Sequence, residues 1–418
     1  MSSQPEHRAD EAGPSSQVAE VPEGLPAIGE VLAGKYRIER VLGIGGMGVV
    51  LAAMHLHLGE RVALKFLLPS VATAETVERF AREARAAARI KSEHVARVTD
   101  VSQTEAGATY MVMEFLEGSD LSDVLRDGGP LPLRDAVEYV IQASDAIADA
   151  HAMGIVHRDL KPANLFLARR PGAPARIKVL DFGISKITPR DQGDEAPIYQ
   201  QRAMTHTRAW LGSPLYMAPE QMKSAKGVDA RTDIWSLGVI LFELLAGTAP
   251  FTGGNLPELC AEILHGKPAD LLSKRAEVPH ELDEVIRKCL EKDPSLRFQN
   301  IAEFVMALVD FAPRRARSVA ERAVSLIEGA GLMRKSIVPR AALDSTLAGD
   351  GLSPRDSVAP PSSLRLEEPS IPRPPRTPSF APDHLANVGQ AATMVAPPPG
   401  VDTESGTRRR SAALVPIL

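Results

Sequence analysis

The chain has 418 residues, of which 44% are hydrophobic, enough for at least one large core within an expected two or three domains. Its 48 Lys and Arg residues against 53 Asp and Glu residues give a formal net charge of −5, so no chain-wide basic field favours nucleic acid or a membrane surface. Cys260 and Cys289 form neither a disulfide framework nor a metal-ligand spacing, which indicates a reducing, cytoplasmic location.

A disordered leader is expected over residues 1–35, because acidic residues, Pro, Ser and Gly dominate it and no apolar signal region is present. The compact part is expected over residues 36–311. Short β-like runs fill residues 36–116 and helical patterns fill residues 117–311, which predicts an α+β fold with a small sheet part, a larger helical part and a ligand cleft between them.

A glycine-rich run, LGIGGMGVV, occupies residues 42–50. Its glycines leave the backbone bare enough for N–H groups to approach phosphate oxygens. In a dinucleotide-binding fold such glycines would open a helix, but here VVLAAM, a turn at residues 58–60 and VALKFL follow. The run is therefore predicted to form a β-hairpin that covers a ligand.

Lys65 stands on the next strand among apolar neighbours, where its ammonium needs an anionic partner. The helical pattern at residues 75–90 places Glu83 at the edge of the buried stripe. At 4 Å and an effective dielectric near 20, such a pair attracts by about 4 kcal/mol before desolvation is subtracted. The pair would orient Lys65 toward phosphates; an ordinary half-exposed ion pair is the alternative.

Charged residues also interrupt the stretch IVHRDLKPANLFL at residues 155–167, which follows a long amphipathic helical pattern. The apolar strand IKVL then ends in Asp181. We expect Asp159, Asn164 and Asp181 to lie in one region, where their oxygen atoms suit Mg²⁺ or Mn²⁺.

Five motifs in register resemble the protein-kinase signature set over residues 36–311. Lys161, two residues after the catalytic Asp, resembles the serine/threonine branch, as in the bacterial Hanks-type kinases, and the resemblance implies a bilobal fold. Asp233 in DIWSLG resembles a helix-capping Asp of the family, and Arg297 resembles the partner of Glu220. The motifs are GxGxxGxV at 43–50, VALK at 62–65, HRDLKPAN at 157–164, DFG at 181–183 and APE at 218–220.

The resemblance implies ATP and protein Ser/Thr hydroxyls as substrates, with a role for each matched residue. Asp159 would accept the hydroxyl proton and Lys161 would neutralise the γ-phosphate. Lys65, oriented by Glu83, would bind the α- and β-phosphates, while Asn164 and Asp181 would hold the metal. Met113 would stand at the gate of the adenine pocket, or serve only as core packing. The implied nucleotide-binding positions are Leu42, Gly43, Ile44, Gly45, Gly46, Met47, Gly48, Val49, Val50, Ala63, Lys65, Met113, Glu114 and Leu116.

Regulation is expected in the long polar segment between Asp181 and Glu220. Arg158 precedes the catalytic Asp and could dock a phosphate on this segment. By resemblance, Thr205 or Thr207 is the site of trans-autophosphorylation, which requires self-association, and Ser213 touches Lys161 and Asp159. Unmodified surface threonines are the alternative.

The remaining segments are expected to lie outside the catalytic machinery. The residues at 169–175 look like a surface insertion without catalytic meaning, and those at 312–340 like a basic, solvated exit helix or linker. A disordered tail follows at 341–418; 14 of the 34 prolines lie beyond residue 338, and Phe380 is the only aromatic there.

Prolines at period three over residues 369–378 fit either a polyproline II ligand for a partner's aromatic groove or a stiff linker. Residues 407–418 are basic and then apolar, like the start of a membrane span of a longer parent protein. No complete span is visible in the sequence.

Three other functions compete with a protein kinase. A pseudokinase or ATP-binding scaffold with a partner-binding tail would be expected to lack one of Lys65, Asp159, Asn164 and Asp181, yet all are present. A small-molecule phosphotransferase would be expected to lack SPLYMAPE and DIWSLG. A structural adaptor that uses its PxxP segment would keep its role without catalysis.

Overall fold

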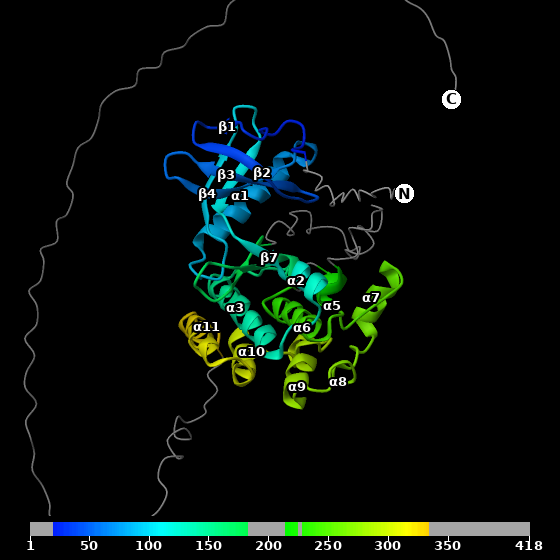
Figure 1. Ribbon diagram of the computed structural model, residues 1–418. Helices are drawn as coiled ribbons and strands as arrows, with labels where there is room; N and C mark the ends of the chain where they lie inside the picture. The colour runs from blue at the N-terminus through cyan, green and yellow to red at the C-terminus, as the bar shows by residue number, and fades with distance from the viewer. Residues whose placement is uncertain (1–19, 183–213, 225–227, 334–418) are drawn as a thin grey trace, which may run out of the picture. The chain divides into compact units, whose positions relative to one another are not determined.

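The computed structural model describes residues 20–182, 214–224 and 228–333, and all of these belong to one unit, Met1–Val338. The predicted tail at 341–418 lies outside the described residues. Strands come first along the chain and helices follow (Figure 1). Among the described residues, no helix combines the length and the apolar character needed to cross a bilayer.

A six-stranded antiparallel sheet forms the first part, in the order β1-β2-β3-β4-β6-β5. Along β6, Tyr110 and Val112 pack into one hydrophobic cluster, whereas Met111 and Met113 pack into another that includes α1. This alternation follows from the two-residue period of a strand, and it buries both faces of the sheet. The strands are β1 (Val31–Leu32), β2 (Tyr36–Ile44), β3 (Gly48–His55), β4 (Glu60–Leu67), β5 (Val98–Gln103) and β6 (Thr109–Glu114).

Helix α1 (Ala74–Arg89) confirms the predicted helix at 75–90. It begins at a reciprocal capping box, in which Thr73 accepts from the backbone N–H of Thr76 and Thr76 accepts from that of Thr73. Phe80 and Ala84 bury its apolar stripe against the sheet. Glu83, between them in sequence, reaches Lys65 of β4.

The leader predicted over residues 1–35 is too long. Strand β1 pairs with β2 in antiparallel register, and Val21, Leu25 and Leu32 pack into the cluster beneath the sheet. These three apolar side chains are widely spaced among Gly, Pro and Glu residues, so their sequence pattern did not predict a strand.

The second part is mainly helical. Helix α6 is buried on nearly every side, because apolar residues surround its whole circumference. A small antiparallel sheet, ordered β7-β8-β9, lies where the chain enters this part. The elements are β7 (Gly118–Asp120), α2 (Leu121–Gly128), α3 (Leu133–Ala152), β8 (Leu165–Ala168), β9 (Arg176–Val179), α5 (Pro219–Lys223), α6 (Arg231–Ala246), α7 (Leu256–His265), α8 (Leu271–Lys274), α9 (His280–Cys289), α10 (Ile301–Leu308) and α11 (Arg317–Gly329).

Helix α11 is not the solvated exit helix that the arginine-rich sequence suggested. It packs against α3 and α10, and it buries Ala320, Ala323 and Ile327 (Figure 1). Arg322 of α11 pairs with Asp145 of α3, and Arg315, just before α11, pairs with Glu138 of α3. The folded body therefore extends past residue 311 to at least residue 329.

Candidate active site

The glycine-rich run forms the predicted hairpin between β2 and β3. At its tip, the N–H of Gly45 donates to the carbonyl of Gly48 at 2.8 Å. A Cβ added to Gly48 would lie 2.3 Å from the backbone oxygen of Phe66, so glycine is required there by the approach of β4. Gly43 and Gly46 meet nothing within 4 Å, which leaves that backbone open to a ligand.

Lys65 lies between two carboxylates from distant parts of the chain. Its Nζ is 2.6 Å from Oδ1 of Asp181 and 3.5 Å from Oε1 of Glu83. Burial alone would lower the pKa of Lys65, but Asp181 and Glu83 outweigh burial and raise that pKa. Burial raises the pKa of Glu83 to about 7, although Lys65 acts in the opposite direction. The predicted Lys65–Glu83 pair is thus present, and Asp181 completes it.

The loop after α3 brings the other acidic and amide groups to the same place. The amide of Asn164 donates to the backbone oxygen of Asp159 at 2.8 Å, and Nζ of Lys161 is 3.4 Å from Oδ2 of Asp159. The N–H of Leu180 donates to the carbonyl of Asn164 at 2.8 Å, which fixes Asp181 beside this loop. Asp159, Asn164 and Asp181 therefore lie in one region, as expected from the sequence.

Asp233 anchors this loop through hydrogen bonds to its backbone. It lies in the first turn of α6, whose N-cap is Ala230. The prediction that Asp233 caps this helix is therefore wrong. Its carboxylate instead accepts from the backbone N–H groups of His157 and Arg158, at 2.8 and 2.9 Å, and lies 2.8 Å from Nε2 of His151. These contacts lower the pKa of Asp233 despite its complete burial.

Two non-glycine residues of the site have positive φ angles, 65° at Arg158 and 46° at Asp181. Such angles are uncommon outside glycine and cost of order 1–3 kcal/mol where they occur. At these two positions they turn the chain just before Asp159 and just after β9. Backbone strain therefore accompanies the placement of both acidic side chains.

The donor set at this place fits a hard divalent cation. Asp181 offers a partly exposed carboxylate, and Asn164 donates through its nitrogen, so that its amide oxygen is kept as an acceptor. Carboxylate and amide oxygens are preferred ligands of Mg²⁺ and Mn²⁺. Among the described residues, no group of three or more His, Cys, Asp or Glu side chains forms a complete protein cage for a metal. The remaining ligands would thus come from water and a bound phosphate.

A cavity of about 560 Å³ opens beside these groups. Leu42, Gly43 and Val50 line it from the hairpin, Ala63 and Lys65 from β4, and Asp181 from the opposite wall. Its volume lies within the range of small-ligand sites. Met113, Glu114 and Leu116, predicted for the adenine side, also line it.

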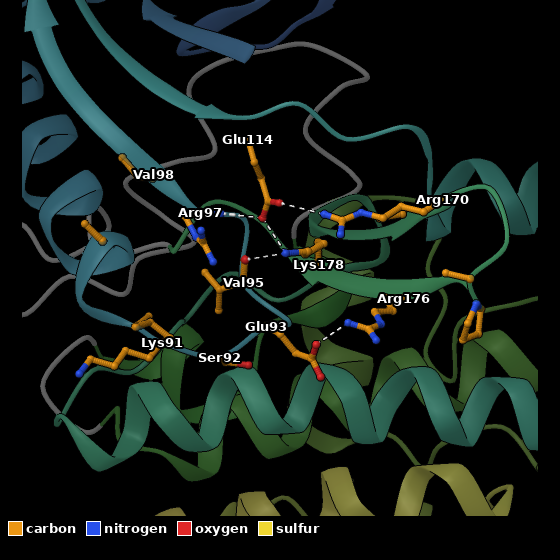
Figure 2. Close-up of a pocket in the computed structure, with 15 residues that line it drawn as sticks. Lys91, Ser92, Glu93, Val95, Arg97, Val98, Glu114, Arg170, Arg176 and Lys178 are labelled. Atoms are coloured by element: carbon orange, nitrogen blue, oxygen red, sulfur yellow. Dashed lines mark hydrogen bonds and ion pairs between the residues drawn. The ribbon is translucent and has the colours of Figure 1, made fainter. Parts of the chain in front are cut away.

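Glu114 has a role that the sequence did not reveal. Its backbone N–H donates to the carbonyl of Arg97, and its carboxylate accepts from the N–H of Arg97 and from Nζ of Lys178, at 2.9 and 2.6 Å (Figure 2). Arg170 lies 3.9 Å away on another side. Glu114 thus ties the end of β6 to the β8–β9 hairpin.

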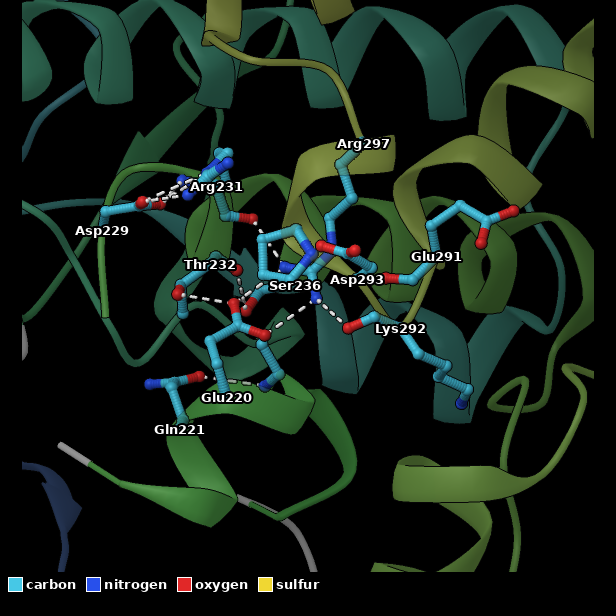
Figure 3. Close-up of polar contacts among 12 residues, drawn as sticks. Glu220, Gln221, Asp229, Arg231, Thr232, Ser236, Glu291, Lys292, Asp293 and Arg297 are labelled. Atoms are coloured by element: carbon cyan, nitrogen blue, oxygen red, sulfur yellow. Dashed lines mark hydrogen bonds and ion pairs between the residues drawn. The ribbon is translucent and has the colours of Figure 1, made fainter. Parts of the chain in front are cut away.

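The predicted pairing of Arg297 with Glu220 is present and bidentate, with two nitrogen–oxygen distances of 2.8 Å (Figure 3). Thr232 donates to the same carboxylate at 2.9 Å, and Arg297 also donates to backbone oxygens of Glu291 and Arg231. Arg297 is only 2% exposed. This network fastens the APE segment to the helical body.

The three predicted regulatory hydroxyl residues, Thr205, Thr207 and Ser213, lie outside the described residues. Arg158 is described, and its buried Nε has no hydrogen-bond partner within the described part of the chain.

Comparison with known proteins shows the family. The protein kinase domain model matches residues 36–307. Serine/threonine-protein kinase pkn3 of Myxococcus xanthus is 37% identical over 332 residues, which cover 78% of this chain and 59% of that protein. Pkn1 of the same organism is 41% identical over 285 residues, which cover 68% of this chain and 39% of that protein. PknB of Mycobacterium leprae is 33% identical over 328 residues, which cover 75% of this chain and 50% of that protein. The chain thus spans between about two fifths and three fifths of these relatives.

The solved kinase domain of Mycobacterium tuberculosis PknI superimposes with a TM-score of 0.52 and 28% sequence identity, covering 69% of this chain and all of that one. This likeness agrees with the sheet and helical parts described above. With the motifs in order and the domain model matched over most of the folded body, the chain belongs to the protein kinase family.

Proposed function

We propose that the chain is a serine/threonine protein kinase, which transfers the γ-phosphate of ATP to Ser and Thr hydroxyls of proteins. The observation that carries the proposal is the position of Lys65, 2.6 Å from Asp181 and 3.5 Å from Glu83 at the wall of the 560 Å³ cavity. A desolvated lysine balanced by two carboxylates, beneath an open glycine backbone, suits a triphosphate with its cations.

Each residue then has a physical task. Lys65, held by Glu83, binds the α- and β-phosphates, and Lys161 neutralises the γ-phosphate. Asp159 orients the substrate hydroxyl and accepts its proton. Asn164 and Asp181 hold Mg²⁺ or Mn²⁺, which when bound neutralises phosphate charge. Because phosphoryl transfer has a loose transition state, positioning and positive charge contribute most of the acceleration.

We place the catalytic domain within the folded body, with a sheet lobe that ends at residue 116 and a helical lobe that begins at residue 117 and extends through α11 to at least residue 329. The Pro-rich segment in the tail at 341–418 would serve as a ligand for a partner's aromatic groove.

Autophosphorylation in trans on Thr205 or Thr207, within a transient pair of chains, would activate the enzyme, with Ser213 contacting Lys161 and Asp159. The buried Nε of Arg158 supports this part of the proposal: it has no hydrogen-bond partner among the described residues, as expected for a cation that awaits a phosphate.

Phosphosite mapping after incubation with Mg-ATP tests the catalytic proposal. The variant Asp159→Asn is expected to incorporate phosphate about 10²–10⁴ times more slowly than the unmodified chain, the usual loss for a positioned acid-base group. Asp127→Asn, an exposed carboxylate at the end of α2, is the matched control and should behave as the unmodified chain. Equal incorporation by the chain and by Asp159→Asn would remove Asp159 from its assigned role.

A further inference from the structure

A second cavity, of about 720 Å³, lies on the other side of Glu114 from the nucleotide cavity, and Glu114 lines both. Three segments build it: the chain from the end of α1 into β5 (residues 88–98), Glu114, and the β8–β9 hairpin (residues 168–178) (Figure 2). The hairpin includes residues 169–175, for which the sequence suggested no role. We call this cavity the basic pocket.

Cations outnumber acids in the basic pocket. Five Lys and Arg side chains line it against two carboxylates, although the whole chain carries a net charge of −5. Both carboxylates are already engaged, Glu114 by Lys178 and Glu93 by Arg176. The five cationic residues are Lys91, Arg97, Arg170, Arg176 and Lys178.

Two of these cations are not neutralised. Within the described residues, the side chains of Lys91 and Arg97 form no ion pair, whereas their backbone N–H groups are bound to Asp149 and Glu114. Their backbone is therefore fixed while their charges remain available. A surplus of positive charge inside a concave site attracts anions more strongly than the same charge on a flat surface.

Hydrogen bonds to α3 and β9 fix the walls of the pocket. Ser92 donates to Asp145 of α3 at 2.6 Å, and Lys91 is fixed to Asp149 through its N–H at 2.8 Å. The N–H of Val179 donates to the carbonyl of His94 at 2.7 Å, which joins the loop to β9. The pocket is thus a fixed feature of the folded body and not a gap between loose loops.

Apolar groups alternate with the charges. Val95, Val98, Ala173 and Pro174 line the same cavity, which also lies within the size range of sites for small ligands and short peptides. An inorganic anion would satisfy the cations and leave this apolar surface in water. A peptide would cover both.

We propose that the basic pocket binds a protein segment that carries a phosphoserine or phosphothreonine flanked by acidic and small apolar residues. A guanidinium presents paired donors that match the oxygens of a phosphate, and Arg97 and Arg170 line the site from two different segments. The proposal rests on the proposed function in one respect: a serine/threonine kinase generates ligands of this kind. The pocket would hold a phosphorylated product or partner directly behind the nucleotide site.

Binding of a synthetic phosphopeptide pool to the full chain tests the proposal. The pool consists of nine-residue peptides with a central phosphothreonine and flanking positions drawn from Asp, Glu, Ala and Leu, with affinity measured by fluorescence anisotropy. We expect saturable binding that weakens about tenfold for each cation removed in Lys91→Ala and in Arg97→Ala. Arg134→Ala and Lys274→Ala remove exposed cations that do not line the pocket, and should leave the affinity unchanged.

Other outcomes would overturn the proposal. The proposal fails if the phosphorylated pool does not bind, or if the unphosphorylated pool binds with the same affinity. It also fails if the Lys91→Ala, Arg97→Ala double variant binds the phosphorylated pool as tightly as the unmodified chain, or if inorganic phosphate displaces the labelled peptide at the same concentration as unlabelled peptide does. Because the peptides are made synthetically, the result does not depend on catalysis by the chain. Activity toward a generic Ser/Thr peptide, measured on the same variants, is expected to be unchanged, so failure of the pocket and failure of the proposed function remain distinguishable.

Discussion

Replacing Arg322 of α11 with alanine is expected to destabilise the folded body, although α11 lies beyond the residues that the kinase domain model matches. Arg322 forms an ion pair with Asp145 of α3, which is completely buried, and lies 3.7 Å from Asp149. Asp145 also accepts from Ser92, and its Oδ1 is buried without a hydrogen-bond partner. Without Arg322, Asp145 would keep a buried charge with little compensation.

The magnitude follows from burial. Removing one partner of a buried ion pair costs about 3–5 kcal/mol. The side chain of Arg322 is 40% exposed, so water screens part of the interaction, and we expect a loss of about 2 kcal/mol in the free energy of unfolding. For a folded body of about 300 residues, that loss lowers the melting temperature by roughly 3 °C.

Thermal unfolding of Arg322→Ala and Arg317→Ala provides the assay. Arg317 lies on the same helix, but its ion pair with Asp310 is exposed on both sides, so its removal should cost about 0–1 kcal/mol. Hydrogen exchange adds a local readout: the amide of Lys91, which donates to Asp149, should exchange faster in Arg322→Ala alone. Equal shifts of melting temperature in the two variants would refute the reasoning, because α11 would then contribute only through its apolar stripe.

Three further outcomes are expected. Burial raises the pKa of Glu83 to about 7 from an ordinary value of 4.5, so the folded state binds a proton more tightly than the unfolded state, and stability should decrease as pH rises from about 4.5 to about 7. Nucleotide affinity should instead rise through pH 7, because ionised Glu83 pairs with Lys65. Both trends should be absent when Glu83→Gln is titrated. Gly48→Ala forces a Cβ against a backbone oxygen and should lower stability by about 1–3 kcal/mol in denaturant unfolding. Arg297→Ala leaves Glu220 without its bidentate partner and should cost about 3–5 kcal/mol in the same assay, with partial recovery in Arg297→Lys.

The geometry of the candidate site could be predicted from sequence because local chemistry determines it. A lysine among apolar strand residues needs a carboxylate, and the helical period of α1 offered Glu83 at the right edge. The glycine run could form only a hairpin, because a strand follows it. The second carboxylate, Asp181, was expected near the site but not as a direct partner of Lys65, because that contact joins residues 116 positions apart in the sequence.

The features that sequence did not predict depend on contacts between distant segments. Helix α11 has a weak apolar stripe of two alanines and an isoleucine among arginines, which is typical of a solvated helix. It packs its apolar stripe against the core, and α3 carries carboxylates opposite two arginines, 177 residues earlier for both Arg315–Glu138, just before the helix, and Arg322–Asp145. The basic pocket likewise requires three segments that no sequence window contains together.

The buried Asp233 explains how the site can hold a strained residue. The positive φ angle of Arg158 costs of order 1–3 kcal/mol, and the backbone would relax if nothing opposed it. Asp233 accepts from the two N–H groups that lead into the strained angle, those of His157 and Arg158, and hydrogen bonds to a charged acceptor stabilise by about 1.5–3 kcal/mol each. Two such bonds offset the strain and leave a surplus that fixes Asp159 against rotation. A residue that touches neither nucleotide nor substrate therefore determines where the proposed catalytic carboxylate stands.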